Sequence, residues 1–174
     1  MLILGLCGSL RRHSYNRRLL KAAARGLPDD VKLDIFNGLA EIPPYNDDLE
    51  APETVVVLRQ ALAAASAVLV ATPEYNASVP GHLKNALDWA SRPWPYNCLR
   101  GKPSAVIGAS TGLFGAIWAQ AEVRKVLNTI GARVVDEELP VGQVDSVFDE
   151  EGGLRDPGLR AKLADVLNQL ITLV

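Results

Sequence analysis

The amino-acid sequence predicts an α/β fold in which helices cover both faces of a parallel β-sheet. Short apolar segments alternate along the chain with longer segments whose apolar residues recur at helical spacing. Most of the short segments lack polar alternation, as strands do when a parallel sheet is buried on both faces. The 174 residues contain no linker and no internal repeat, so we expect a single domain over residues 1–174.

The first third of the chain predicts two strands around a helix. Residues 2–7 are continuously apolar and end at Gly8, as expected of a buried strand. In residues 16–25, leucine and alanine recur at helical spacing opposite basic residues, and Gly26 follows as a C-cap. Residues 31–36 alternate apolar and charged side chains, which indicates a half-buried strand at an edge of the sheet.

The next segments predict a loop, a helix and a second buried strand. Residues 37–52 are rich in glycine, proline, asparagine and aspartate, which favours a loop. Residues 53–65 predict a helix, with Pro52 well placed at its first turn. Residues 67–72 are apolar up to Pro73, which stops the strand.

The remaining segments complete the alternation. They predict a helix over 80–91, a loop over 92–103, a strand over 104–109, the longest helix over 115–130, a last strand beginning at 133–135, a loop over 145–158 and a helix over 159–173. Five strands in this pattern predict a flavodoxin-like three-layer sandwich with a five-stranded parallel sheet of order 2-1-3-4-5. Ligands of such sheets bind at the carboxyl ends of the strands, so we expect the site after Cys7, Thr72 and Ala109.

Composition, net charge and the length of the apolar runs exclude several classes of protein. Hydrophobic residues make up 48% and charged residues 22%, which excludes intrinsic disorder. The net charge of −2 offers no basic excess, so we expect no nucleic-acid partner. No apolar run suits a membrane span or a signal peptide, so we expect no membrane partner and a complete, cytoplasmic chain. Cys7 and Cys98 lack the spacing of metal ligands, so we expect free thiols and no metal site.

The first candidate loop, residues 8–16, reads GSLRRHSYN and leads into a helix. Free backbone N–H groups and the helix dipole favour an anion there, and Arg11 or Arg12 can neutralise it. Small polar side chains can cap the helix or donate to the anion: Ser9, Ser14 and Asn16. Helix capping with solvated arginines explains the residues equally well in isolation. The position after the first strand favours phosphate binding.

The loop also limits the kind of phosphate. The dinucleotide fingerprint GxGxxG and the P-loop GxxxxGK[ST] are both missing. A serine-rich loop without a second close glycine suits a single terminal phosphate monoester. Flavin mononucleotide (FMN) is the obvious candidate.

The second candidate loop carries the most specific motif. Residues 73–92 read PEYNASVPGHLKNALDWASR. This segment resembles the PEYN…P-G-x-L-K-N-A-x-D-W signature of NADPH-dependent FMN reductases, a family that includes bacterial quinone, azo and chromate reductases. The first loop resembles the phosphate motif of the same family, and the resemblance covers essentially the whole chain.

The resemblance implies a set of cofactor contacts on the three loops. They are Ser9, Arg11, Ser14, Tyr15, Asn16, Pro73, Glu74, Tyr75, Asn76, Ser110, Thr111 and Gly112. Within the signature we interpret Lys84, Asn85, Asp88 and Trp89 as mainly structural, with Asn85 and Asp88 one turn apart and able to tie down this second loop. His82 is expected to be packed or solvated rather than catalytic.

The third loop, residues 110–115, matches the family less closely. Its glycines would let backbone approach the flavin ring. The sequence carries Phe114 where many relatives have paired glycines, and Trp118 is larger than expected. Both aromatic residues are assigned either to core packing or to the substrate side of the flavin. For Arg124, solvent exposure is the default expectation, with pairing across a subunit interface as the alternative.

These observations predict an FMN-dependent NAD(P)H oxidoreductase. Hydride would pass from NAD(P)H to FMN, and electrons then to a small-molecule acceptor such as a quinone, azo compound, free flavin or metal oxyanion. Because the cofactor supplies the chemistry, we expect no catalytic side chain. The resemblance implies a homodimer or homotetramer.

Two other functions remain open. A flavodoxin-type electron carrier would be strongly acidic and would carry a TxTGxT loop, and both features are absent. A non-enzymatic flavin-binding or regulatory module on the same fold is not excluded by fold alone.

Overall fold

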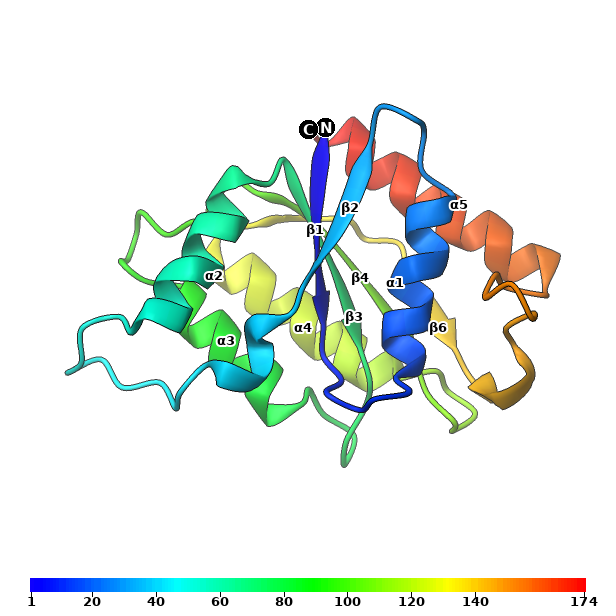
Figure 1. Cartoon of the computed structure of the whole chain (residues 1–174), viewed down its shortest axis with the longest axis horizontal. Helices are drawn as coiled ribbons and strands as arrows, with labels where there is room; N and C mark the ends of the chain where they lie inside the picture. The colour runs from blue at the N-terminus through cyan, green and yellow to red at the C-terminus, as the bar shows by residue number, and fades with distance from the viewer.

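The computed structural model describes all 174 residues. Its strands are β1 (Leu2–Cys7), β2 (Lys32–Phe36), β3 (Ala67–Thr72), β4 (Pro103–Ala109), β5 (Arg133–Val134) and β6 (Leu139–Val141). Its helices are α1 (Tyr15–Arg25), α2 (Glu53–Ala64), α3 (Gly81–Ala90), α4 (Ile117–Ile130) and α5 (Pro157–Thr172), with 3₁₀ turns at Gly38–Glu41 and Val144–Ser146. The predicted alternation of strands and helices is confirmed (Figure 1).

The predicted strand order is also confirmed. The parallel strands follow the order β2-β1-β3-β4-β5, so β1 lies between β2 and β3. The flavodoxin-like switch point therefore lies beside the carboxyl ends of β1 and β3. In Figure 1 these ends point toward the bottom of the view, and the chain termini lie together at the top.

The edge beyond β4 differs from the prediction of one fifth strand. The start of β4 pairs with β5 in the register Pro103 opposite Arg133, and its end pairs with β6 in the register Ile107 opposite Leu139. Between β5 and β6 the chain contains the acidic run 136–138, whose residue types are depleted in strands. The edge position is therefore filled by two short strands instead of one.

Two helix starts also differ from the prediction. The long helix begins at Ile117 instead of residue 115, because Gly115 and Ala116 have left-handed backbone angles (φ 58° and 61°) that a right-handed helix cannot include. The last helix begins earlier than residue 159, at Pro157, where the Asp156 side chain accepts the N–H of Leu159 as an N-cap.

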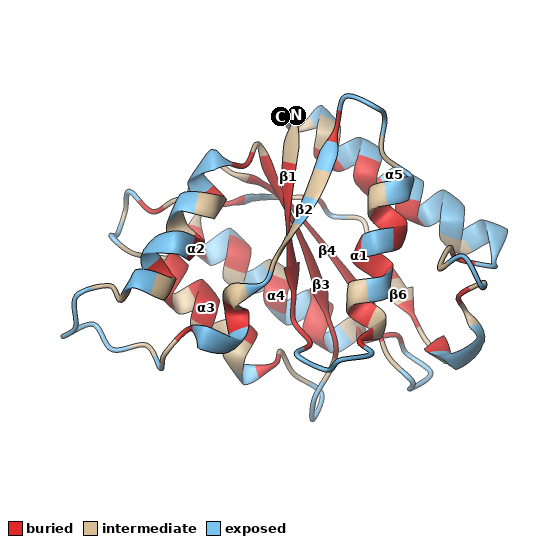
Figure 2. Cartoon of the chain, viewed as in Figure 1, coloured by how far each residue is buried: buried red, intermediate tan, exposed pale blue.

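The sheet separates two apolar cores. Helices α1 and α5 cover one face, and α2, α3 and α4 cover the other (Figure 1). Along β1, Ile3 belongs to the core under α1 and α5, whereas Leu4 and Leu6 belong to the core under α2 and α3. Figure 2 shows β3 and β4 buried throughout, β1 buried beyond its first residue, and the helices buried on one side only. No helix combines the length and apolarity needed to cross a lipid bilayer.

The predicted loop over residues 37–52 is fastened to α3 by Asn85, whereas the sequence suggested that Asn85 and Asp88 tie down the second loop. The Asn85 side chain accepts the N–H of Tyr45 at 2.7 Å and donates to the carbonyl of Pro43 at 2.9 Å. The indole of Trp89 donates to the same carbonyl at 2.8 Å. Asp88 does not reach this loop and instead pairs with Lys84 one turn earlier in α3, at 2.7 Å.

The Asn85→Ala substitution should destabilise the protein by about 1–3 kcal/mol, because it leaves half-buried backbone groups of the loop without partners. Urea denaturation followed by circular dichroism measures this loss. Asp88→Ala is the matched control on the same helix, and loss of its exposed ion pair should cost no more than about 0.5 kcal/mol. Equal losses in the two variants would show that Asn85 does not hold the loop.

Candidate functional site

Three loops meet at the carboxyl ends of β1, β3 and β4, where the sequence places the site (Figure 1). Most of the predicted residues line one hollow between these loops. That hollow is formed by Ser9, Arg11, Tyr15, Asn16, Pro73, Glu74, Tyr75, Ala109, Ser110 and Thr111. The other predicted residues, Ser14, Asn76 and Gly112, lie on the same loops outside this lining. Residues from three distant parts of the sequence thus form one candidate site.

The first and second loops approach each other at Gly8. A Cβ atom at this position would lie 2.8 Å from the Leu83 side chain and 3.1 Å from the Pro73 ring. The Gly8 N–H donates to the carbonyl of Ala71 at 2.8 Å. The missing side chain of Gly8 lets the loop after β1 pack closely against Pro73 of the loop after β3.

The first loop leaves its backbone donors free. None of the N–H groups from Ser9 through Asn16 donates to a protein acceptor. The first paired N–H groups of α1 belong to Arg17 and Arg18, which donate to the side chain and the carbonyl of Ser14, each at 3.1 Å. Free N–H groups at a helix N-terminus, with Arg11 beside them, are chemically suited to hold an anion.

Ser14 and Asn16 shape this loop from within. Both are buried, and Ser14 is the N-cap of α1. The Asn16 amide donates to the Ala109 carbonyl and accepts the Ala109 N–H, both at 2.9 Å. This pair of bonds joins the start of α1 to the end of β4. The two side chains therefore hold the framework, and the ligand contacts predicted for them remain predictions.

Tyr15 is held by residues that sequence reasoning missed. Its hydroxyl donates to the Asp145 carboxylate at 2.7 Å, and this hydrogen bond raises the pKa of Tyr15. Its ring stacks on Phe148 with 6.4 Å between centroids, and the Arg18 guanidinium lies 4.5 Å from the Phe148 centroid. Asp145 follows Tyr15 by 130 residues, so no local spacing signals the contact.

The second loop, residues 73–80, contains a tight turn. The backbones of Tyr75 and Ser78 exchange two hydrogen bonds of 3.2 Å, and the turn is closed by Asn76 and Ala77, both with left-handed backbone angles (φ 53° and 58°). Asparagine tolerates this conformation well, whereas alanine rarely adopts it. The turn leaves the Tyr75 and Asn76 side chains exposed beside the hollow.

Two carboxylates fasten the second loop to α4. Glu74 accepts the N–H groups of Trp118 and Ala119 at 3.0 and 3.1 Å, and so caps a helix that has no capping side chain of its own. Glu122 accepts the Ser78 hydroxyl at 2.5 Å and the Val79 N–H at 3.2 Å. These bonds lower the pKa of Glu122. The Glu74 carboxylate is thus engaged in positioning the loop.

The third loop packs backbone to backbone on β6. A Cβ atom on Gly142 would lie 2.1 Å from the Leu113 carbonyl oxygen, and one on Gly115 would lie 2.5 Å from the Pro140 backbone. Ser110 donates its N–H to the carbonyl of Val141 at 3.0 Å. Gly115 therefore accommodates the neighbouring chain segment, and the close approach of a flavin ring to the glycines of this turn stays a prediction.

Large apolar side chains beside this loop lie in solvent. Leu113, Phe114 and Trp118 are 67%, 58% and 49% exposed, and the two aromatic rings meet edge to face at 5.2 Å. Core packing, one of the two assignments for Phe114 and Trp118, is therefore wrong for both.

Arg124 and His82 are both partly buried in the structure. Arg124 pairs with Glu138 of the same chain, and its side chain is only 14% exposed, so the expectation of a solvated arginine is wrong. Burial lowers the pKa of its guanidinium. His82 is half-buried, and burial lowers its pKa as well. His82 is thus partly packed, which lies between the packed and the solvated state expected for it.

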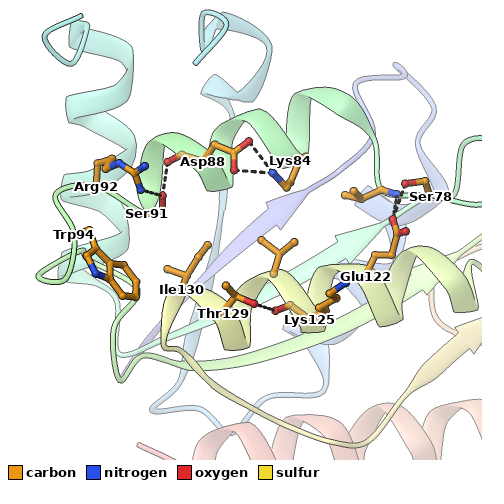
Figure 3. A pocket seen from close by; sticks show the side chains of 12 residues that line it. Ser78, Lys84, Asp88, Ser91, Arg92, Trp94, Glu122, Lys125, Thr129 and Ile130 are labelled. Carbon is orange, nitrogen blue, oxygen red and sulfur yellow. Dashed lines mark hydrogen bonds and ion pairs between the residues drawn. The ribbon is translucent and has the colours of Figure 1, made fainter. Parts of the chain in front are cut away.

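A groove between α3 and α4 lies next to the second loop (Figure 3). Its volume is about 670 Å³. Lys84, Asp88, Glu122 and Lys125 give it charges of both signs, and Figure 3 shows the Lys84–Asp88 pair and the Ser78–Glu122 bond along its rim. The sequence did not predict this groove, because its residues are spread over two helices whose packing was unknown.

Comparison with known proteins assigns the family. The sequence pattern of NADPH-dependent FMN reductases matches residues 1–145. An NAD(P)H-dependent FMN reductase of Pseudomonas aeruginosa is 39% identical over 172 residues, which cover 97% of this chain and 92% of the relative. A 2-hydroxy-1,4-benzoquinone reductase of a Burkholderia species is 38% identical over 93% of this chain and 90% of its own.

A solved structure agrees with this assignment. The flavoenzyme NAD(P)H:(acceptor) oxidoreductase FerB from Paracoccus denitrificans superimposes with a TM-score of 0.87 at 33% identity, covering 99% of this chain and 96% of its own. One conclusion follows from the strand order, the three loops at the carboxyl ends of the strands and these similarities. The chain belongs to the NADPH-dependent FMN reductase family.

Proposed function

We propose that this protein is an FMN-dependent NAD(P)H oxidoreductase that reduces quinones and other small-molecule acceptors. Its family and its full-length similarity to an NAD(P)H-dependent FMN reductase and to quinone reductases support this function. The proposal treats residues 1–174 as one flavin-binding domain. A cytoplasmic location is part of it and fits the free thiols of Cys7 and Cys98.

The free N–H groups of residues 9–16 carry the proposal. A phosphate monoester is a compact dianion that accepts several hydrogen bonds, and a helix N-terminus with unpaired donors and an arginine supplies them. The residues present therefore fit the phosphate of FMN. We assign Arg11, Ser9 and the backbone of the first loop to this phosphate.

The other two loops would hold the rest of the cofactor. We assign the Tyr75–Asn76 turn and the backbone of Ser110, Thr111 and Gly112 to the ribityl chain and the ring, because these groups line or flank the same hollow. When bound, FMN supplies the capacity to accept hydride and pass on electrons. The protein side chains would bind and orient the cofactor, and we assign no side chain as a catalytic acid or base.

Stopped-flow spectroscopy of the FMN-loaded protein tests the proposed activity. NADPH or NADH should bleach the flavin absorbance directly, and a quinone should restore it. A flavodoxin-type carrier would bind FMN without oxidising NAD(P)H, and a module without flavin would not take up FMN. Either of these results would reject the proposed function.

The Arg11→Ala substitution should weaken FMN binding about 10- to 150-fold, because it removes a charge-assisted hydrogen bond worth about 1.5–3 kcal/mol. Quenching of flavin fluorescence measures the affinity. Lys162→Ala, on the exposed side of α5, is the control and should bind FMN normally. Unchanged FMN affinity in Arg11→Ala would remove this arginine from the phosphate site.

We also propose that the protein is a homodimer or homotetramer. Leu113, Phe114 and Trp118 expose a large apolar surface beside the site, which is typical of an interface. The adjoining α3–α4 groove carries Lys84 and Lys125 along with Asp88 and Glu122. Charges of both signs in one groove can pair with their counterparts across a two-fold axis.

The double substitution Phe114→Glu with Trp118→Glu should therefore shift the protein toward monomer in light scattering at micromolar concentration. Carboxylates on this surface would repel one another across the interface. Leu49→Glu, which also changes an exposed apolar residue but lies in the loop before α2, should leave the oligomer intact. A wild-type monomer under these conditions would contradict the proposed assembly.

A further inference from the structure

A second, strongly basic hollow adjoins the candidate FMN site. Its volume is about 440 Å³. It is lined by Arg11, Arg12, His13, Ser14, Tyr15, Arg17, Arg18 and Lys21. Arg11 and Tyr15 also line the hollow between the three loops, so the two spaces share a wall. The second hollow continues from this wall along α1 as far as Lys21.

No basic side chain of this hollow forms an ion pair with a carboxylate of the chain. The ion pairs of the structure are Lys84–Asp88, Arg92–Asp47 and Arg124–Glu138, and none includes a residue of the hollow. Its nearest carboxylate contact is the bond from the Tyr15 hydroxyl to Asp145. Like charges held this close repel one another, and an anion relieves the repulsion. The concentration of charge is notable in a chain whose net charge is −2.

One phosphate group cannot use the whole hollow. Lys21 follows Tyr15 by six residues, which is about 9 Å along a helix that rises about 1.5 Å per residue. The phosphate assigned to the free N–H groups lies at the first turn of α1, beyond direct contact with Lys21. Lys21, at the far end of the hollow, is therefore available to a different anionic group, and Arg18 lies between Lys21 and the first turn.

We propose that Arg18 and Lys21 bind the 2′-phosphate of NADPH and thereby favour NADPH over NADH. This inference rests on the proposed function. NADPH differs from NADH only by this phosphate, which is a dianion near neutral pH and is well matched by arginine donors. Both side chains are exposed, and neither donates a hydrogen bond to a protein acceptor. Arg18 is also supported by the Phe148 ring under its guanidinium.

The test uses the double substitution Arg18→Gln with Lys21→Gln, which removes the charges and keeps helix-forming side chains. With FMN saturating, kcat/KM for NADPH should fall about tenfold or more, whereas kcat/KM for NADH should change less than about twofold. A second readout needs no turnover: calorimetry should show the same fall in affinity for 2′,5′-ADP and no change for 5′-ADP. FMN affinity should stay as in the wild type.

The control removes the same charge elsewhere. Lys32→Gln with Lys162→Gln changes exposed lysines on β2 and α5 and should leave all of these quantities unchanged. An equal loss for NADPH and NADH would assign the hollow to the shared diphosphate. A parallel loss of FMN affinity would assign it to the FMN phosphate. Either result, unchanged kinetics, or a wild type without NADPH preference would overturn the inference.

Failure of the proposed function would be separately visible. In that case the wild type would not oxidise either nicotinamide nucleotide. The 2′,5′-ADP titration would still show whether Arg18 and Lys21 hold a 2′-phosphate, because it depends on neither FMN nor turnover.

Discussion

The buried amide of Asn16 is the contact on which the rest of the site depends. By bonding both backbone groups of Ala109, it fixes the first loop relative to the third. Two further contacts complete the arrangement: Gly8 lets the first loop touch the second, and Glu74 joins the second loop to α4 directly after the third. Each loop is therefore tied to the other two by a residue of the family motifs. A substitution at any of these residues would move two walls of the site at once.

This arrangement explains why the first loop can keep its N–H groups unpaired. Residues 10–13 are exposed, so water can satisfy their N–H groups and no burial penalty forces the loop to close on itself. Ser14 and Asn16 are buried and hold the backbone, so the N–H groups from Ser9 onward stay unpaired and available to the proposed ligand. Such preorganisation lowers the ordering cost of binding. Arg18 and Lys21 belong to the same helix, so the proposed second anionic contact would lie on the element that begins at the proposed phosphate site.

Apolar patterning was enough to predict the layers, because the strands and helices here are continuous and differ clearly in period. The strand order followed from the parallel topology and is confirmed. The location of the site followed from the same topology and stays a prediction. Patterning failed at the edge of the sheet, where a short acidic run divides one strand position into β5 and β6. Patterning also failed to predict the burial of Arg124, because its ion-pair partner Glu138 lies beside it only after the chain has folded back. The role of Glu74 could not be predicted either, since it caps a helix 44 residues further along the chain.

The central claim is that the protein recognises its flavin chiefly through the terminal phosphate. Calorimetric titration of the flavin-free protein with FMN and with riboflavin tests it most directly, because the two ligands differ only in that group. Several charge-assisted hydrogen bonds predict that FMN binds about 100-fold or more tightly than riboflavin. Equal affinities for the two ligands would contradict the claim.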